Sequence, residues 1–170
     1  MIPVIETERL ILRAQRMSDF EPYAAHMGSD RARYEDGPKN QKEAWFDFAG
    51  SQGHWLLLGF GCWAIERRED GAFCGLTGIN RHVHYPEHEL GWSLLEHAEG
   101  QGIAFEAAVA ARDYARKHQG IGELVSYIDP DNTRSIKLAE RLGAVLDPQA
   151  ATPENDPCRV YRHPNQTGAK

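Results

Sequence analysis

Apolar positions along the chain fall into short runs bounded by turn residues and into longer runs with helical spacing. The short runs predict strands, because alternating or continuous apolar segments suit a half-buried or buried extended chain. They cover residues 10–12, 61–66, 73–79, 89–95, 124–128 and 158–163. The longer runs predict helices at residues 18–26, 41–52, 103–117 and 133–142. Strands and helices that interleave in this way are typical of an α/β domain.

Turn and cap residues define several of these elements more closely. Residues 67–72 contain Asp70-Gly71 between two apolar runs, which predicts a hairpin. Ser18 and Glu21 have the spacing of a capping box, so we expect the first helix to start at Ser18.

Three aromatic residues of the second predicted helix, Trp45, Phe46 and Phe48, are too densely spaced to share one face. Packing between the helix and the sheet accounts for each of them. The alternative is that some of them line a pocket.

A glycine turn between the strand at 89–95 and the long helix is the main functional signal. Gly100 and Gly102 carry no Cβ, so the backbone N–H groups of this turn can approach an anion closely. The following helix adds its positive N-terminal end. We therefore expect a phosphate or pyrophosphate site here.

Three phosphate-binding patterns compete for this turn. The pattern GxxxxGK[ST] is absent. The dinucleotide pattern GxGxxG requires a small residue where the chain has Phe105, and no βαβ unit with a ribose-binding acid clearly follows. The acetyltransferase pattern [Q/R/W]-x-x-G-x-[G/A] aligns with residues 99–104 and departs only at its first position, Glu99.

With this turn the chain resembles the GNAT superfamily of N-acetyltransferases, in the branch of the ribosomal-protein-alanine acetyltransferases. Four segments, in order and spacing, carry the resemblance across nearly the whole chain. They are residues 6–13 (ETERLILR), 89–92 (ELGW), 100–107 (GQGIAFEA) and 132–144 (NTRSIKLAERLGA). The resemblance implies a mixed, mostly antiparallel sheet of six or seven strands with helices on both faces. It also implies acetyl transfer from acetyl-CoA to an amine by direct attack.

The resemblance further implies which residues bind acetyl-CoA. One strand of the family's sheet splays from the next, and the pantetheine arm pairs with its exposed backbone like an added strand. The implied contacts are Trp92, Ser93, Leu94, Gly100, Gln101, Gly102, Ile103, Ala104 and Asn132. Asn132 also stands where an N-cap would begin the helix that follows, and one residue can serve both roles.

Several positions depart from the family pattern. Glu99 would repel a pyrophosphate, so we expect its side chain to face solvent. Ala139 replaces a tyrosine thought to protonate the leaving thiolate, and we expect Ser135, one turn earlier on the same helix face, to stabilise the thiolate instead. Some relatives carry a glutamate base where this chain has Tyr127.

Glu89 is the predicted general base. It begins the strand whose later residues should hold the cofactor, and alternation puts it on the face of Gly91 and Ser93. The alternatives are that Glu89 only pairs with a neighbouring strand, and that His88 or water accepts the proton. His82 and His84 would face the same way on a strand, but neither a Cys pair nor an HExxH motif accompanies them, so we expect no metal.

Composition limits the classes of partner. The 170 residues fit one domain, predicted to span 1–164 with a mobile tail at 165–170. A formal charge of −6 without a basic run argues against nucleic acid. The expected acceptor is a protein N-terminal α-amine or a small-molecule amine.

Cysteine usage and the terminus indicate the compartment. Three widely spaced cysteines form no CxxC pair, so we expect no disulfide framework. No run has the length of a signal core or of a membrane span, which favours a cytoplasmic protein, monomeric or homodimeric. The alternative functions are a non-catalytic CoA-binding sensor and a plain interaction domain.

Overall fold

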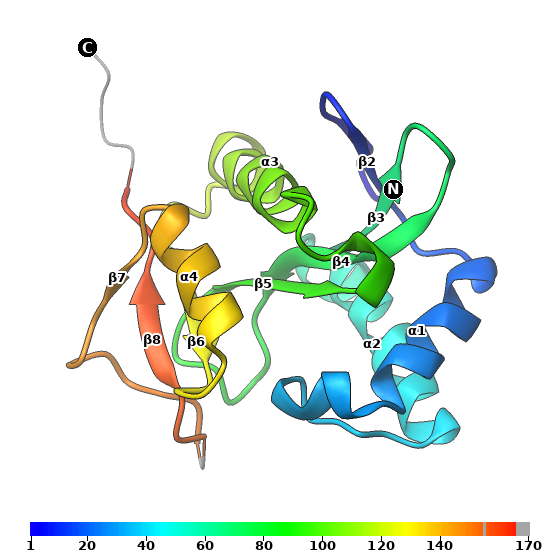
Figure 1. Cartoon of the computed structure of the whole chain (residues 1–170). Helices are drawn as coiled ribbons and strands as arrows, with labels where there is room; N and C mark the ends of the chain where they lie inside the picture. Colours follow the sequence, from blue (N-terminus) through cyan, green and yellow to red (C-terminus); the bar gives the residue numbers. More distant parts are fainter. Residues whose placement is uncertain (155, 166–170) are drawn as a thin grey trace.

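The computed structural model describes residues 1–154 and 156–165 and has one open sheet flanked by helices (Figure 1). Its strands follow the order β1-β2-β3-β4-β5-β6-β8-β7. They are β1 (Ile5–Glu6), β2 (Leu10–Arg13), β3 (Cys62–Arg67), β4 (Phe73–Asn80), β5 (Glu89–Leu94), β6 (Val125–Ile128), β7 (Val145–Leu146) and β8 (Arg159–Arg162). The expected α/β fold with a mostly antiparallel sheet is confirmed. The strand count is eight because β1 and β7, two residues each, are too short to produce an apolar pattern.

Helices cover both faces of the sheet, as expected. α1 (Phe20–Met27) and α2 (Gln41–Leu58) pack on one face, where Tyr23 and Phe48 meet Leu76 of β4. α3 (Ile103–His118) packs on the other face against β2 to β5 through a row of alanines. α4 (Thr133–Arg141) lies beside β6, and the short helices η1 (Met17–Asp19), η2 (Asp30–Tyr34) and η3 (Glu96–Ala98) complete the connections (Figure 1).

β5 and β6 are the only parallel neighbours in the described sheet, and they pair through one residue of each strand. Their register consists of one pair, Glu89 with Val125, whose N–H donates to the carbonyl of His88 at 3.0 Å. On its other edge β5 pairs with β4 along its whole length, from Glu89 to Leu94. Beyond Glu89, therefore, β5 has one paired edge and one edge without a strand partner.

Two helices differ from their predicted bounds. α2 continues past the predicted end at Gln52 to Leu58 and stops at Gly59, whose φ of +78° is left-handed. Tertiary contacts extend it: Trp55 packs against Trp63 with ring centroids 4.6 Å apart, and its Nε1 donates to the Cys62 carbonyl at 2.8 Å. Of the dense aromatics, Phe48 is buried, whereas Phe46 lines a cavity described below.

The predicted capping box at Ser18 is wrong. α1 begins at Phe20, after the short helix η1, and no side chain caps it. The residue that organises this turn is Asp19, whose carboxylate accepts the Arg16 N–H at 2.8 Å. Asp19 takes this part because Arg13 holds it in place.

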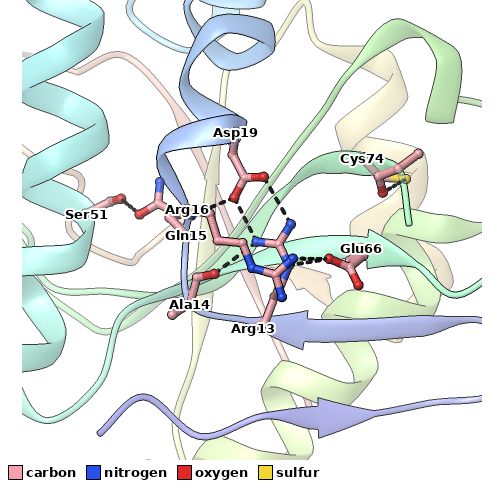
Figure 2. Close-up of polar contacts among 9 residues, drawn as sticks. Arg13, Ala14, Gln15, Arg16, Asp19, Ser51, Glu66 and Cys74 are labelled. Atoms are coloured by element: carbon pink, nitrogen blue, oxygen red, sulfur yellow. Dashed lines mark hydrogen bonds and ion pairs between the residues drawn. The ribbon is translucent and has the colours of Figure 1, made fainter. Parts of the chain in front are cut away.

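Arg13 forms a buried charge cluster that joins β2, η1 and β3 (Figure 2). Its guanidinium donates to both carboxylate oxygens of Asp19, at 2.7 and 3.0 Å, and through Nε to Glu66 at 2.5 Å. Arg13 is 5% exposed and Asp19 is 2% exposed, so water compensates neither charge. Removing one partner of a buried ion pair leaves the other charge without compensation and destabilises the fold.

The described residues also bear on the remaining predictions for the whole chain. The predicted tail, residues 165–170, lies outside them except for Asn165. All three cysteines are free thiols. Among residues 1–154 and 156–165, no helix combines the length and the apolarity that crossing a membrane requires.

Asp19→Asn should lower the free energy of unfolding by about 3 kcal/mol, because it leaves the buried Arg13 without its main counter-charge. Urea denaturation of the purified variant measures this. Asp30→Asn, the same change at an exposed position, is the control and should stay within about 0.5 kcal/mol of the wild type. Equal effects at the two positions would contradict a structural role for the cluster.

Candidate functional site

Two hollows adjoin where β5 and β6 diverge. The larger, here named the large cavity, has a volume of about 500 Å³ and lies between α1 and α2 on one side and β4, β5 and β6 on the other. The second, named the small groove, has about 200 Å³ and runs along the turn after β5 and the start of α4. Both are lined by Tyr34, Glu35, Trp92, Ser93, Asn132 and Ser135. The predicted site residues Trp92, Ser93, Asn132 and Ser135 therefore lie at their junction.

The glycine turn presents unused backbone donors. Gly100 and Gly102 have φ values of +72° and +75°, in the left-handed region that glycine adopts without strain. Within the described residues, no hydrogen bond uses the backbone N–H groups of residues 100–105. They precede or form the first turn of α3, where the helix dipole is positive. The turn can therefore bind an anion.

Side chains of the turn have different roles. Ala104 and Gly100 line the small groove. Ile103 is buried in the core beneath α3. Gln101 is exposed and donates from Nε2 to the His97 carbonyl at 2.6 Å. Of the expected turn contacts, Gln101 and Ile103 can thus contribute through their backbone, not through their side chains.

Glu106 ties the start of α3 to the N-terminal segment. Its carboxylate accepts from the Thr7 hydroxyl at 2.6 Å, the Arg9 backbone N–H at 2.9 Å and Arg9 Nε at 2.7 Å. Burial opposes ionisation, but these hydrogen bonds hold the pKa of Glu106 below its ordinary value. Arg9 also donates to the Gln101 carbonyl at 2.8 Å, which connects the glycine turn to the N-terminal segment.

The expectation that Glu99 faces solvent is wrong. Its carboxylate accepts from Arg31 at 3.0 and 3.1 Å and from Arg134 at 2.6 Å. All three side chains line the small groove. Two arginines thus neutralise the carboxylate that the sequence puts beside an anion site, and Arg31 also pairs with Glu96.

The unpaired edge of β5 faces the junction of the hollows. The carbonyls of His88 and Leu90 point toward β6, since they accept from Val125 N–H and from Ser126 Oγ at 2.6 Å. Backbone polar groups alternate along a strand, so those of Trp92 and Leu94 point the same way. β6 has diverged by then. An extended chain with amide groups could pair with this edge.

α4 begins with the expected cap. The Asn132 side chain accepts the Ser135 N–H at 3.2 Å. Ser135 Oγ accepts from Trp92 Nε1 at 3.2 Å, which links α4 to β5 and keeps the hydroxyl proton of Ser135 available. Ala139, expected on the same face, is fully buried against Ile128 and Tyr161 and lines neither hollow.

Glu89 lies on the wall of the large cavity, at the point where β5 and β6 part. Desolvation raises its pKa to about 7, and the charges of Asp156 and Asp36 act in the same direction. A hydrogen bond from Asn80 Nδ2, 3.0 Å from Oε2, opposes the shift. A carboxyl group with a pKa near 7 can both accept and release a proton at neutral pH.

Two side chains at the site had no signal in the sequence. Tyr34 lies at the junction of the hollows, and its hydroxyl donates to the Asp131 carbonyl at 3.3 Å, bridging η2 and the loop before α4. Asn80 of β4 donates to Glu89, the residue opposite it on β5. Tyr127, which stands where some relatives carry a glutamate base, also lines the large cavity and accepts the Glu87 N–H at 3.1 Å.

The histidine-rich loop contributes to the cavity only in part. His82 lines it and packs against His54 with ring centroids 4.8 Å apart, and burial lowers the pKa of both. His84 stacks on His82 at 5.8 Å. In the part of the chain that the structure describes, no group of three or more His, Cys, Asp or Glu residues is arranged to hold a metal.

The combination of free turn amides, two arginines and an unpaired strand edge fits a long ligand that has phosphate groups at one end and amide groups along an extended arm. Coenzyme A has this chemistry. The turn would hold its pyrophosphate, and β5 would hold its pantetheine arm.

Comparison with known proteins agrees with this fit. Residues 9–145 match the family described as Acetyltransferase (GNAT) domain. The structure resembles that of an acetyltransferase from Agrobacterium tumefaciens str. C58, with a TM-score of 0.92 and 41% identity, covering 97% of this chain and 96% of that one.

More distant relatives extend the comparison. YkkB, an uncharacterized protein of Bacillus subtilis (strain 168), is 31% identical over 107 residues, which are 62% of this chain and 61% of that protein. The chain therefore aligns with about three fifths of YkkB. RimL, a ribosomal L7/L12 alpha-N-protein acetyltransferase solved in complex with coenzyme A, has a TM-score of 0.73 at 20% identity, covering 94% of this chain and 96% of that one. At 20% identity, the likeness to RimL shows a shared fold. The resemblance to the ribosomal-protein acetyltransferases is supported as a resemblance of fold.

Glu99→Gln should raise the affinity for coenzyme A by roughly fivefold, because it removes a negative charge and frees Arg31 and Arg134 to meet phosphate. Calorimetry at low and high salt measures this, and the gain should shrink with salt. Glu96→Gln is the control, since Glu96 also pairs with Arg31 but lies outside the small groove. A weaker affinity of the Glu99 variant would mean that Glu99 instead holds the arginines in their binding positions.

Proposed function

Because the chain belongs to the GNAT acetyltransferase family, we propose that it transfers the acetyl group of acetyl-CoA to a primary amine by direct attack in a ternary complex. The observation that carries the proposal is the junction of the two hollows. The small groove borders the turn whose free N–H groups suit coenzyme A, and the large cavity, which adjoins it at Trp92 and Ser93, is lined by Glu89. Acetyl-CoA supplies a reactive thioester, and the protein supplies orientation and proton transfer.

Backbone and cap residues orient the donor in this proposal. The N–H groups of residues 100–105 bind the pyrophosphate, with Arg31 and Arg134 nearby. The outward-facing N–H and C=O groups of Trp92 and Leu94 pair with the amides of the extended arm. Ser93 and Asn132 line both hollows and so border the reacting end.

Glu89 takes the proton that the amine must lose. An α-amine has a pKa near 8 and a lysine-type amine near 10.4, so both are largely protonated at neutral pH. With its raised pKa, Glu89 is basic enough to accept a proton from such an ammonium, directly or through water, when the pH is near or above 7.

Ser135 is proposed to assist the leaving group. Its hydroxyl already accepts from Trp92 and keeps its own proton to donate to a thiolate. The need is modest, since a thiol with a pKa near 8.5 leaves readily at neutral pH. In the overall balance an ammonium and a thioester give an amide, a free thiol and one proton released to solvent.

The proposal also includes the compartment. A reducing cytoplasm is the compartment we propose, because all three cysteines are free thiols.

The direct test of acetyl transfer is incubation with acetyl-CoA and a panel of amines while the release of free thiol is followed. Binding of acetyl-CoA without thiol release for any amine would support the alternative, a CoA-binding sensor without catalysis.

Glu89→Gln should lower kcat by roughly a hundredfold or more at pH 7, because the amide cannot accept a proton. The wild-type rate should rise with pH through about 7 as Glu89 ionises, and this limb should vanish in the variant. The loss should shrink as the pH approaches the pKa of the amine. Glu140→Gln, an exposed change on α4, is the control. A near-normal rate at neutral pH would rule Glu89 out.

The same variant should change the pH dependence of stability. The fold raises the pKa of Glu89 from about 4.5 to about 7, so the folded state favours the protonated form. As pH rises through this window the wild type loses that stabilisation, because the unfolded chain ionises more readily. The melting temperature of Glu89→Gln relative to wild type should therefore be higher at pH 8 than at pH 4.5. A difference that does not vary with pH would contradict the raised pKa.

A further inference from the structure

The wall of the large cavity carries many more carboxylates than cations. Lys39 is the one lysine or arginine among the described lining residues. The carboxylates are those of Glu35, Asp36, Asp47, Glu89, Asp129 and Asp156. Since His54 and His82 have lowered pKa values, they do not offset this excess at neutral pH.

Two of the six carboxylates lie beside a basic side chain. Asp47 pairs with Lys39, and Glu35 lies 3.2 Å from His26 Nε2. Among the described residues Asp129 has no basic partner and accepts only the N–H of Asp131, at 2.8 Å.

Asp36 and Asp156 likewise lack a basic partner. In the part of the chain that the structure describes, no hydrogen bond or ion pair engages the Asp36 carboxylate, and the partner of Asp156 is Cys158, whose N–H donates to it at 3.1 Å. Both residues are exposed, so they lie at the rim of the cavity, whereas Glu89 lies further in. Their charges still reach Glu89 and contribute to its raised pKa.

The two rim carboxylates come from segments far apart in the sequence. Asp36 follows η2, and Asp156 belongs to the connection from β7 to β8. The segment between α1 and α2 reaches across toward β6 (Figure 1), and the Tyr34 hydroxyl bridge to Asp131 holds it there. The rim therefore carries carboxylates from two separate segments of the chain.

The wall of the large cavity is also rich in aromatic side chains. They are those of Tyr23, Tyr34, Phe46, Tyr85, Trp92 and Tyr127. Aromatic faces suit both methylene chains and cations. The cavity thus combines Glu89, aromatic surface, and two exposed acids without a basic partner.

We propose that the acceptor is a small aliphatic diamine-type molecule, with the reacting amine at Glu89 and a second cationic group, several bonds away, between Asp36 and Asp156. This inference rests on the proposed function and specifies its substrate class. A cleft of uncompensated negative charge concentrates cations and speeds their entry. The second cation therefore acts mainly on kcat/KM.

The test compares matched amines under the free-thiol assay. 1,4-Diaminobutane should exceed butylamine in kcat/KM by roughly tenfold or more. The double variant Asp36→Asn/Asp156→Asn should lose about tenfold with the diamine and stay within about twofold with butylamine. Asp113→Asn, the same charge change on α3 away from the cavity, should alter neither amine.

Several results would overturn the inference and spare the proposed function. Equal use of the two amines would do so, as would an equal loss for both in the double variant. A short peptide with a free N-terminal alanine and uncharged side chains that outperforms the diamine would point to a protein N-terminus instead. If no amine releases thiol, the proposed function fails. In that case, thermal stabilisation by the diamine over butylamine, lost in the double variant, still tests the rim carboxylates.

Discussion

The divergence of β5 from β6 after a single residue pair is the constraint on which the site depends. Strands that remained paired would consume the backbone groups of Trp92 and Leu94 and would close the space between the two hollows. The split is stabilised at both ends. Ser126 and Val125 hold β6 to β5 near Glu89, and the Trp92 to Ser135 hydrogen bond spans the opening further along. Both hollows adjoin at this opening, where Trp92 and Ser93 line each of them.

Charge is handled differently at the two ends of this opening. At the groove, Glu99 and Glu106 each have arginine partners, so an anion meets a balanced surface with free amides. At the cavity, Glu89 has only Asn80 as a hydrogen-bond donor among the described side chains, and burial raises its pKa. Nearby cations thus favour the ionised form of Glu99 and Glu106, whereas burial without a cation favours the protonated form of Glu89. A cationic acceptor would supply the missing counter-charge.

The sequence determined those features that depend on neighbouring residues. Apolar periodicity located most elements, and the α/β fold and the family are confirmed. Gly100 and Gly102 indicated a turn whose backbone N–H groups are accessible, and Asn132 indicated a helix cap, because both depend on local backbone geometry. The four matching segments further restricted the fold, since their spacing covers nearly the whole chain.

Only the tertiary structure decided what depends on contacts distant in sequence. α2 extends to Leu58 because Trp55 packs on β3. Asp19, and not Ser18, organises the turn before α1 because the buried Arg13 holds its carboxylate. The same holds for the partners of Glu99, the burial of Ala139 and the presence of Asp36 and Asp156 on the wall of one cavity. The pKa of Glu89 is the clearest case: a carboxyl in this sequence would titrate near 4.5, and desolvation inside the fold raises it to about 7. Desolvation is a property of everything packed around a group, so no local pattern of residues can encode it.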